Sequence, residues 1–129
     1  MPDRERSLLI VEDDENLRRI VSLHLRAQGY EVAEASSVED ATVAIRGGLR
    51  PAVVILDLNL PGDTGWDLLR SPVLAGGGSP PVIITSATRV SPKRLAEFRC
   101  AGYLPKPFPL DTLVATIERS LDSRDGKDA

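Results

Sequence analysis

The stretch Val53-Val54-Ile55-Leu56-Asp57 decides the fold. Four apolar residues in a row, bounded by Pro51 and by the turn-forming pair Pro61-Gly62, indicate a buried strand. An acid that ends a buried strand costs free energy unless something compensates its charge. In an open α/β sheet, the carboxyl ends of the strands are also where ligands bind. Asp57 is therefore a candidate for a chemical group placed at the edge of such a sheet.

Size and composition indicate one ordinary globular domain. The chain has 129 residues, of which 42% are hydrophobic and 27% charged. The net charge of −3 gives no electrostatic reason to expect direct nucleic-acid binding by this domain. The single cysteine, Cys100, is expected to be a packing residue and fits a reducing compartment. Because the sequence shows neither a signal peptide nor a membrane-spanning stretch, we expect a cytoplasmic location without membrane insertion.

Strand-like and helix-like segments alternate five times along the chain. This alternation predicts right-handed βαβ units and a mostly parallel, doubly wound sheet with helices on both faces. The nearly continuous apolar strands agree, because parallel strands are buried on both sides. The expected strands are 7–11, 30–35, 52–57, 82–85 and 102–104, and the expected helices are 16–28, 37–46, a short one near Trp66, 92 to 98 or 99, and 110–121.

Polar side chains follow four of these strands, and a doubly wound sheet would bring them to one edge. They are Glu12, Asp13, Asp57, Thr85, Ser86, Thr88 and Lys106. Clustered carboxylates repel one another unless a cation joins them, and oxygen ligands of this kind suit Mg²⁺. With the ion bound, Asp57 could act as a nucleophile that forms an acyl phosphate. Lys106 and a hydroxyl would then offset charge on the transferred phosphoryl group.

Several motifs carry a resemblance to a known family, and their order matters more than any one of them. They are Glu12-Asp13 after Leu8-Leu9-Ile10-Val11, then Asp57-Leu58-Asn59-Leu60-Pro61-Gly62 with Gly65, then Ser86-Ala87, and Tyr103-Leu104-Pro105-Lys106-Pro107-Phe108. With these motifs the chain resembles the receiver domains of bacterial two-component response regulators, particularly the single-domain chemotaxis type. The resemblance implies a flavodoxin-like (βα)5 fold with strand order 2-1-3-4-5.

The resemblance also implies a metal site and a phosphoacceptor. Asp57 would accept the phosphoryl group, and Asp13 would bind Mg²⁺ directly. Glu12 would hold a water of the ion, and Asn59 would contribute its backbone carbonyl. The phosphoryl donor would be a histidine kinase or a histidine phosphotransfer protein. The resemblance implies no enzyme activity beyond self-phosphorylation and self-dephosphorylation at Asp57.

A switch is implied in the same way. Ser86 would be the switch hydroxyl, Lys106 the cationic partner of the phosphoryl group, and Tyr103 the aromatic that turns inward when Ser86 moves. The Lys106-Pro107 peptide bond is expected to be cis, which would aim the lysine into the site. The output surface would be formed by the expected helices 92–98 and 110–121 with the strand 102–104 between them.

Two assignments have close competitors in the sequence. The acidic pair could be Asp13-Asp14, but Glu12-Asp13 is preferred because the first strand ends at Val11. Thr85 and Thr88 compete with Ser86, since strand alternation lets only one of the three hydroxyls point at Asp57. The Ser-Ala pair favours Ser86.

Other residues are expected to have structural roles, and the domain limits follow the motifs. His24 and Trp66 are predicted to be packing residues. We expect an extension over 1–6, a receiver domain over 7–121 and a polar tail or linker over 122–129. The chain could be a stand-alone regulator or the N-terminal piece of a longer response regulator or hybrid kinase, and its oligomeric state is open.

Three other functions share parts of this pattern. A haloacid-dehalogenase-like phosphatase needs a general acid two residues after its nucleophile, where this chain has Asn59. A flavodoxin-like FMN carrier needs a phosphate loop after the first strand, and the acidic residues 12–15 would repel a phosphate there. A pseudo-receiver that only binds partners would not need the intact set of acids, Asp57 and Lys106.

Overall fold

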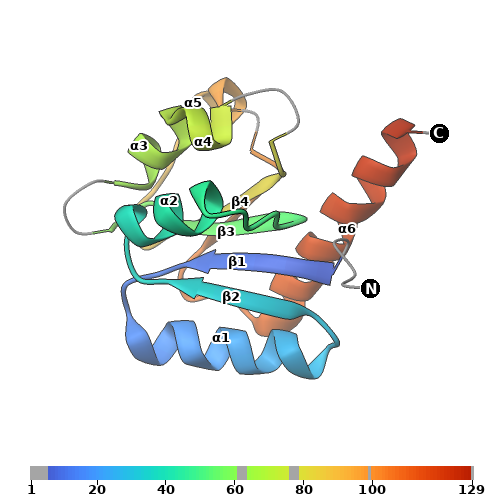
Figure 1. Cartoon of the computed structure of the whole chain (residues 1–129). Helices are drawn as coiled ribbons and strands as arrows, with labels where there is room; N and C mark the ends of the chain where they lie inside the picture. The colour runs from blue at the N-terminus through green and yellow to red at the C-terminus, as the bar shows by residue number, and fades with distance from the viewer. Residues whose placement is uncertain (1–5, 61–63, 76–78, 99, 129) are drawn as a thin grey trace.

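Five strands form one sheet in which every neighbouring pair runs parallel (Figure 1). They are β1 (Ser7–Val11), β2 (Glu31–Ala35), β3 (Val53–Asp57), β4 (Val82–Ser86) and β5 (Gly102–Pro105). Their order is β2-β1-β3-β4-β5, which confirms the predicted doubly wound α/β fold and its strand order. This computed structural model describes residues 6–60, 64–75, 79–98 and 100–128. The predicted turn at Pro61-Gly62, the triple glycine at 76–78 and a helix end at 99 lie outside these residues.

Helices enclose the sheet from both sides (Figure 1). They are α1 (Glu15–Ala27), α2 (Val38–Arg46), α3 (Gly65–Arg70), α4 (Pro72–Ala75), α5 (Pro92–Glu97) and α6 (Leu110–Asp128). Leu8 and Ile10 of β1 pack with α1 and α6, whereas Leu9 and Val11 pack with the layer that contains α2, α3 and α4. This alternation follows from the two-residue period of a strand, and it divides the core into two clusters.

The first two helices begin and end where the sequence predicts. Asp14 caps α1 by accepting a hydrogen bond from the backbone N–H of Leu17, at 3.1 Å. Ser37 caps α2 in the same way. Gly29 and Gly48 follow these helices with φ of 95° and 115°, in the left-handed region that glycine enters at no steric cost.

Two helix boundaries differ from the prediction. The sequence predicts one short helix near Trp66, but α3 ends before Ser71 and Pro72 begins the separate short helix α4. Proline suits the first turn of a helix because its missing N–H would have no intrahelical partner there. The final helix was expected to end at Leu121 before a polar tail, but α6 continues to Asp128. The segment contains no proline, and lengthening an existing helix costs far less than starting one.

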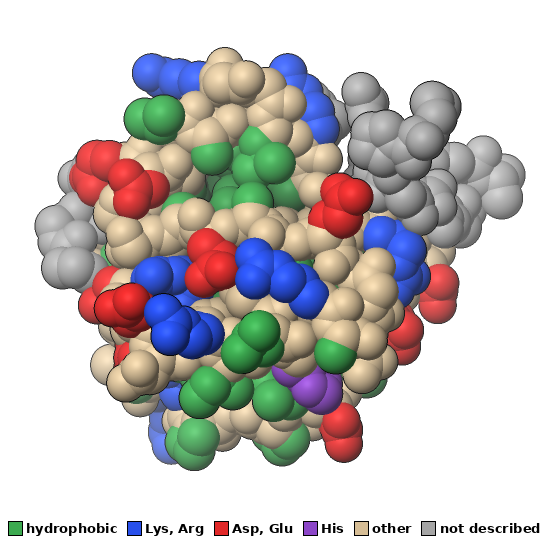
Figure 2. Space-filling model, turned by 60° about the horizontal axis from the view of Figure 1, so that its bottom comes forward, with side chains coloured by type: hydrophobic (Ala, Val, Ile, Leu, Met, Phe, Trp, Pro, Cys, Tyr) green, Lys and Arg blue, Asp and Glu red, His purple; other side chains and the backbone are tan. Residues whose placement is uncertain are grey.

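Figure 2 looks onto the bottom of the view in Figure 1, where α1 lies. Acidic and basic side chains are intermixed on this surface, with hydrophobic side chains among them. On α1, Ile20 and Leu23 are 54% and 59% exposed. Within the described part of the chain, no helix is both long enough and apolar enough to span a bilayer.

Candidate functional site

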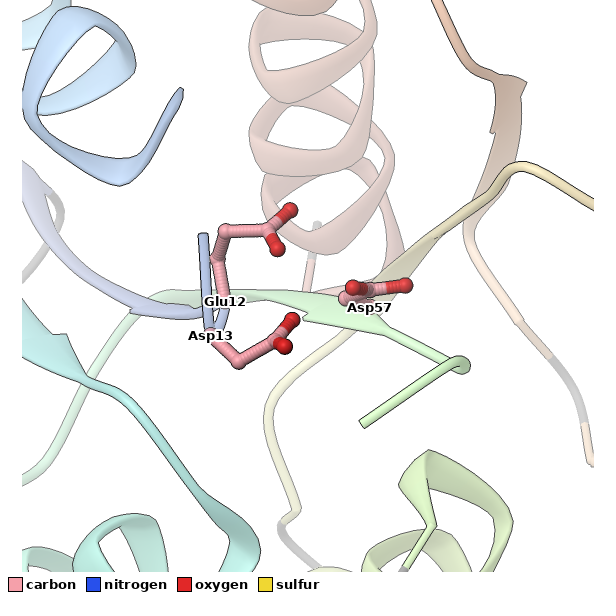
Figure 3. A group of neighbouring side chains, drawn as sticks. All are labelled: Glu12, Asp13 and Asp57. Carbon is pink, nitrogen blue, oxygen red and sulfur yellow. The ribbon is translucent and has the colours of Figure 1, made fainter. Parts of the chain in front are cut away.

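Three carboxylates meet at the carboxyl ends of β1 and β3. Glu12, Asp13 and Asp57 each offer an oxygen atom that lies within 4.8 Å of the others (Figure 3). Glu12 and Asp57 are buried, while Asp13 is exposed. Three hard oxygen donors at this separation could hold a divalent cation such as Mg²⁺.

The geometry also separates Asp14 from this group. Asp14 Oδ1 accepts the Leu17 N–H at the start of α1, so its carboxylate serves the helix terminus. The backbone N–H of Asp14 donates to Glu12 Oε2 at 3.1 Å, which helps to orient Glu12 toward the pocket. This arrangement favours Glu12-Asp13 over Asp13-Asp14 as the acidic pair.

Lys106 brings a positive charge to the buried carboxylates. Its Nζ atom lies 2.6 Å from Glu12 Oε1 and 3.1 Å from Asp57 Oδ2. β5 delivers the lysine, because the Lys106 N–H donates to Ser86 O at 2.8 Å just beyond the strand pair. The Lys106-Pro107 peptide bond is cis, as predicted.

The pKa values of Glu12 and Lys106 are both raised, for different reasons. Burial raises the pKa of Glu12 to about 7, and the neighbouring charge of Asp57 adds to the shift, although hydrogen bonds from Lys106 and the Asp14 N–H oppose it. For Lys106, burial alone would lower the pKa. Its hydrogen bonds to Glu12 and Asp57 outweigh burial, so the pKa rises above its ordinary value and the ammonium stays charged.

A second polar network joins the ends of β3 and β4. The Asn59 N–H donates to Asp57 Oδ1 at 2.9 Å, and the Asn59 side chain accepts the hydroxyl proton of Ser86 at 2.8 Å. Ser86 is 1% exposed, and Thr88 Oγ1 lies 2.9 Å from its hydroxyl. Asn59 thus connects the Asp57 carboxylate to the two hydroxyls.

Comparison with known proteins identifies the family of the chain. The family model described as the response regulator receiver domain matches residues 8–118. The chain belongs to this family. The DNA-binding response regulator MtrA of Mycobacterium tuberculosis is 34% identical over 130 residues, which cover 100% of this chain and 56% of MtrA. The receiver domain described here therefore spans about half the length of that relative.

Solved structures show the same fold. A CheY-like response regulator receiver domain protein from Methanospirillum hungatei has a TM-score of 0.84 and 22% identity, over 95% of this chain and 98% of that chain. The response regulator TrrA of Thermotoga maritima, in complex with Mg²⁺ and beryllofluoride, has a TM-score of 0.77 and 24% identity, over 89% of this chain and 98% of that chain. At these identities the likeness concerns the fold.

Tyr103 links β5 of the receiver domain to the loop after β4. Its hydroxyl donates to the backbone carbonyl of Thr88 at 3.3 Å, and its ring packs partly buried against the core. The loop that carries Ser86 is therefore in direct contact with Tyr103. Thr85 lies opposite Asp57 in the sheet register, and its backbone carbonyl accepts the Leu58 N–H.

Two further residues support the site, and sequence reasoning gave neither of them a role. A Cβ atom at Gly65 would lie 2.7 Å from Asp57 O, so α3 can start this close to β3 only with glycine there. Arg18 donates to the backbone carbonyl of Glu12 at 2.9 Å and pairs with Glu34 at 3.1 Å. The motif marked Gly65, but the spacing between Arg18 and Glu12 carries no signal.

The residues predicted to pack are found away from the carboxylates. His24 is half-buried on α1, and Trp66 stacks on Phe98 with ring centroids 5.1 Å apart. Cys100 is half-buried against the core, and burial raises the pKa of its thiol to about 11. A thiol with that pKa is almost entirely protonated at neutral pH, which agrees with a packing role.

Proposed function

We propose that Asp57 accepts a phosphoryl group and that this receiver domain acts as a switch in a two-component phosphorelay. The donor would be the phosphohistidine of a histidine kinase or of a histidine phosphotransfer protein. The observation that carries the proposal is the contact between Asp57 Oδ2 and the Lys106 ammonium, at 3.1 Å, beside two further carboxylates. A buried acid with a counter-charge and a possible cation site is prepared for phosphoryl chemistry.

The transfer forms one bond and breaks one. An Asp57 oxygen forms the new O–P bond as the P–N bond of the donor breaks, and the electron pair of that bond stays on the donor imidazole. Lys106 offsets negative charge on the phosphoryl oxygens. The Asn59 N–H, which donates to Asp57 Oδ1 at 2.9 Å, keeps the carboxylate oriented during the reaction.

The acidic group fits a resident Mg²⁺ ion. Glu12, Asp13 and Asp57 supply carboxylate oxygens within 4.8 Å of one another, and the backbone carbonyl of Asn59 would complete the protein ligands. When bound, the ion would neutralise charge that develops on the phosphoryl group.

Phosphorylation of Asp57 would then change a surface that lies away from the site. The Ser86 hydroxyl turns to a phosphoryl oxygen, and the loop that it shares with Thr88 moves with it. The Tyr103 hydroxyl donates a hydrogen bond to Thr88 O, so a movement of this loop would change the position of Tyr103 directly. The face formed by α5, β5 and α6 thereby changes its affinity for an output partner by a shift in populations.

The nature of the output follows from the relatives only as a proposal. MtrA is a DNA-binding response regulator about twice the length of this chain. An attached effector domain or a separate output protein could therefore receive the signal. The domain limits 7–121, the cytoplasmic location and the expected lack of direct nucleic-acid binding by this domain stay predictions.

A phosphatase is the weaker alternative. An aspartyl-nucleophile phosphatase would need a general acid at position 59, and the Asn59 amide cannot transfer a proton. Its side chain is in addition bonded to Ser86. Self-phosphorylation and self-dephosphorylation are the reactions that we expect at Asp57.

The proposal is tested by treating the protein with acetyl phosphate and Mg²⁺ and running a phosphate-affinity gel. The wild type and the control Asp111→Asn, which alters an exposed acid on α6, should both show a retarded band. Asp57→Asn should show none. A retarded band in Asp57→Asn, or none in the wild type, would overturn the assignment.

A further inference from the structure

The hydroxyl of Ser86 uses all of its hydrogen-bonding capacity within the protein. It donates to Asn59 Oδ1 at 2.8 Å, accepts the Thr88 N–H at 3.0 Å and lies 2.9 Å from Thr88 Oγ1. A serine hydroxyl has one proton and two lone pairs. Three partners therefore saturate it if the protons are arranged consistently.

One backbone group fixes that arrangement. The Ala87 N–H points at the same Asn59 oxygen, at 3.2 Å, and an N–H can only donate. The atom that faces Ser86 must therefore be the carbonyl oxygen of the amide, which leaves Ser86 as the donor in the Asn59 contact. The Thr88 hydroxyl must then donate to Ser86, and it accepts in turn from Asn59 Nδ2 at 3.4 Å. The hydroxyl protons of Ser86 and Thr88 therefore each have one acceptor in this network.

We infer that the side chain of Asn59 is a positioning residue that holds Ser86 in the resting state. The inference rests on the proposed function, in which Ser86 donates to a phosphoryl oxygen on Asp57. Its single proton cannot be donated to Asn59 and to that oxygen at once, so the Asn59 bond must break first. Asn59 is placed for this role because its backbone N–H already contacts the Asp57 carboxylate.

Removing the amide should therefore favour the phosphorylated conformation. In Asn59→Ala the backbone N–H and carbonyl remain, but Ser86 no longer has to break its hydrogen bond to the Asn59 side chain. Affinity for a phosphoryl mimic should rise about 2- to 13-fold, the range that one hydrogen bond of ordinary net strength supplies. The gain should depend on Ser86, because the bond that is lost belongs to Ser86.

The test is a ¹⁹F NMR titration of the whole chain with beryllofluoride at saturating Mg²⁺. Beryllofluoride is not hydrolysed, so its binding is separate from any effect of Asn59 on the lifetime of an aspartyl phosphate. Asn59→Ala should bind it more tightly than the wild type. In the Ser86→Ala background the same change should give no gain, and Asp111→Asn, which alters an exposed acid on α6, should change the affinity by less than about twofold.

The outcomes separate this inference from the proposed function. Wild-type binding with no gain in Asn59→Ala would overturn the positioning role alone, as would a gain that persists in the Ser86→Ala background. An absence of binding by the wild type would overturn both. Asn59→Leu, which is similar in size and has no acceptor, repeats the test if Asn59→Ala does not fold, and far-UV circular dichroism establishes which variants are folded.

Discussion

The two faces of the sheet are covered in different ways. On one face, α1 has 13 residues and α6 has 19, and Leu25, Leu113 and Ile117 are fully buried between them and the sheet. On the other face, α2 has nine residues, and α3, α4 and α5 have six, four and six. No residue of α5, which is described throughout, is buried. The helices of the first face are held by fully buried side chains, whereas α5 on the second face has no buried residue and little that would prevent its movement.

α5 contacts α3 through an aromatic cluster and has no buried residue of its own. Trp66 of α3 stacks on Phe98 at the end of α5, and the Arg94 guanidinium lies 4.4 Å from the Trp66 ring centroid. Arg70 also lies over the Phe98 ring, at 5.6 Å. Cation–π and aromatic pairs of this kind contribute about 0.5–1.5 kcal/mol each, far less than a buried helix face.

The residues of the candidate site are likewise connected to helices on both faces of the sheet. Glu12 and Lys106 lie on loops that lead toward α1 and α6. Asn59 lies on the loop that leads toward α3, and Ser86 is the last residue of β4, before the loop that leads toward α5. The fixed charges are thus anchored by the well-buried helices. The Ser86 hydroxyl that we expect to rearrange precedes α5, which has no buried residue, whereas the Asn59 amide precedes α3, which buries Leu68 and Leu69.

The largest effect should come from truncating one core residue on each face. Ile117→Ala removes a fully buried side chain beneath α6 and should lower the free energy of unfolding by about 2–5 kcal/mol. Leu95→Ala removes a half-buried side chain of α5 and should cost about 1 kcal/mol. Urea denaturation followed by circular dichroism measures both values. Equal losses would contradict the difference between the faces.

Glu12 should make the binding of Mg²⁺ depend on pH. With its pKa at about 7, Glu12 is mostly protonated at pH 6 and must lose that proton to take part in binding the ion. Mg²⁺ affinity should therefore rise about tenfold from pH 6 to pH 8. Lys106 stays charged over this range because its pKa is raised. Isothermal titration calorimetry should show this rise, and Glu12→Gln should flatten it; an unchanged slope in Glu12→Gln would assign the proton to another group.

The fold could be predicted from the sequence because its strands are nearly continuous apolar runs. Runs such as Val53 to Leu56 are apolar on both faces, which only a covered parallel sheet explains. The candidate site residues could be named because each follows a strand. Their bonds could not, since the saturation of Ser86 depends on the rotamer of Asn59 and on the Ala87 N–H, which no spacing encodes.

The errors lie where sequence signals are local and weak. The separate helix that begins at Pro72 was missed because a proline can either end a helix or begin one, and which occurs depends on the residues that follow. The end of α6 was placed too early because a polar composition indicates exposure and does not by itself end a helix. The Arg18 contact with Glu12 O was missed because it joins a helix side chain to a loop carbonyl.

The smallest effect should come from the cluster that holds α5. Arg94→Ala should lower the free energy of unfolding by at most about 1 kcal/mol, because only half-buried cation–π contacts, with Trp66 and Phe98, are lost. Trp66 is the only tryptophan of the chain, so its fluorescence reports on its contact with Arg94 directly. If α5 moves on activation, Mg²⁺ with beryllofluoride should change the emission of the wild type and of the control Lys93→Ala, which alters an exposed neighbour on α5. The change should be smaller in Arg94→Ala, where the guanidinium is already gone. A constant wild-type emission under saturating ligand would mean that the weakly held face stays in place, and the comparison of the two faces would then concern stability alone.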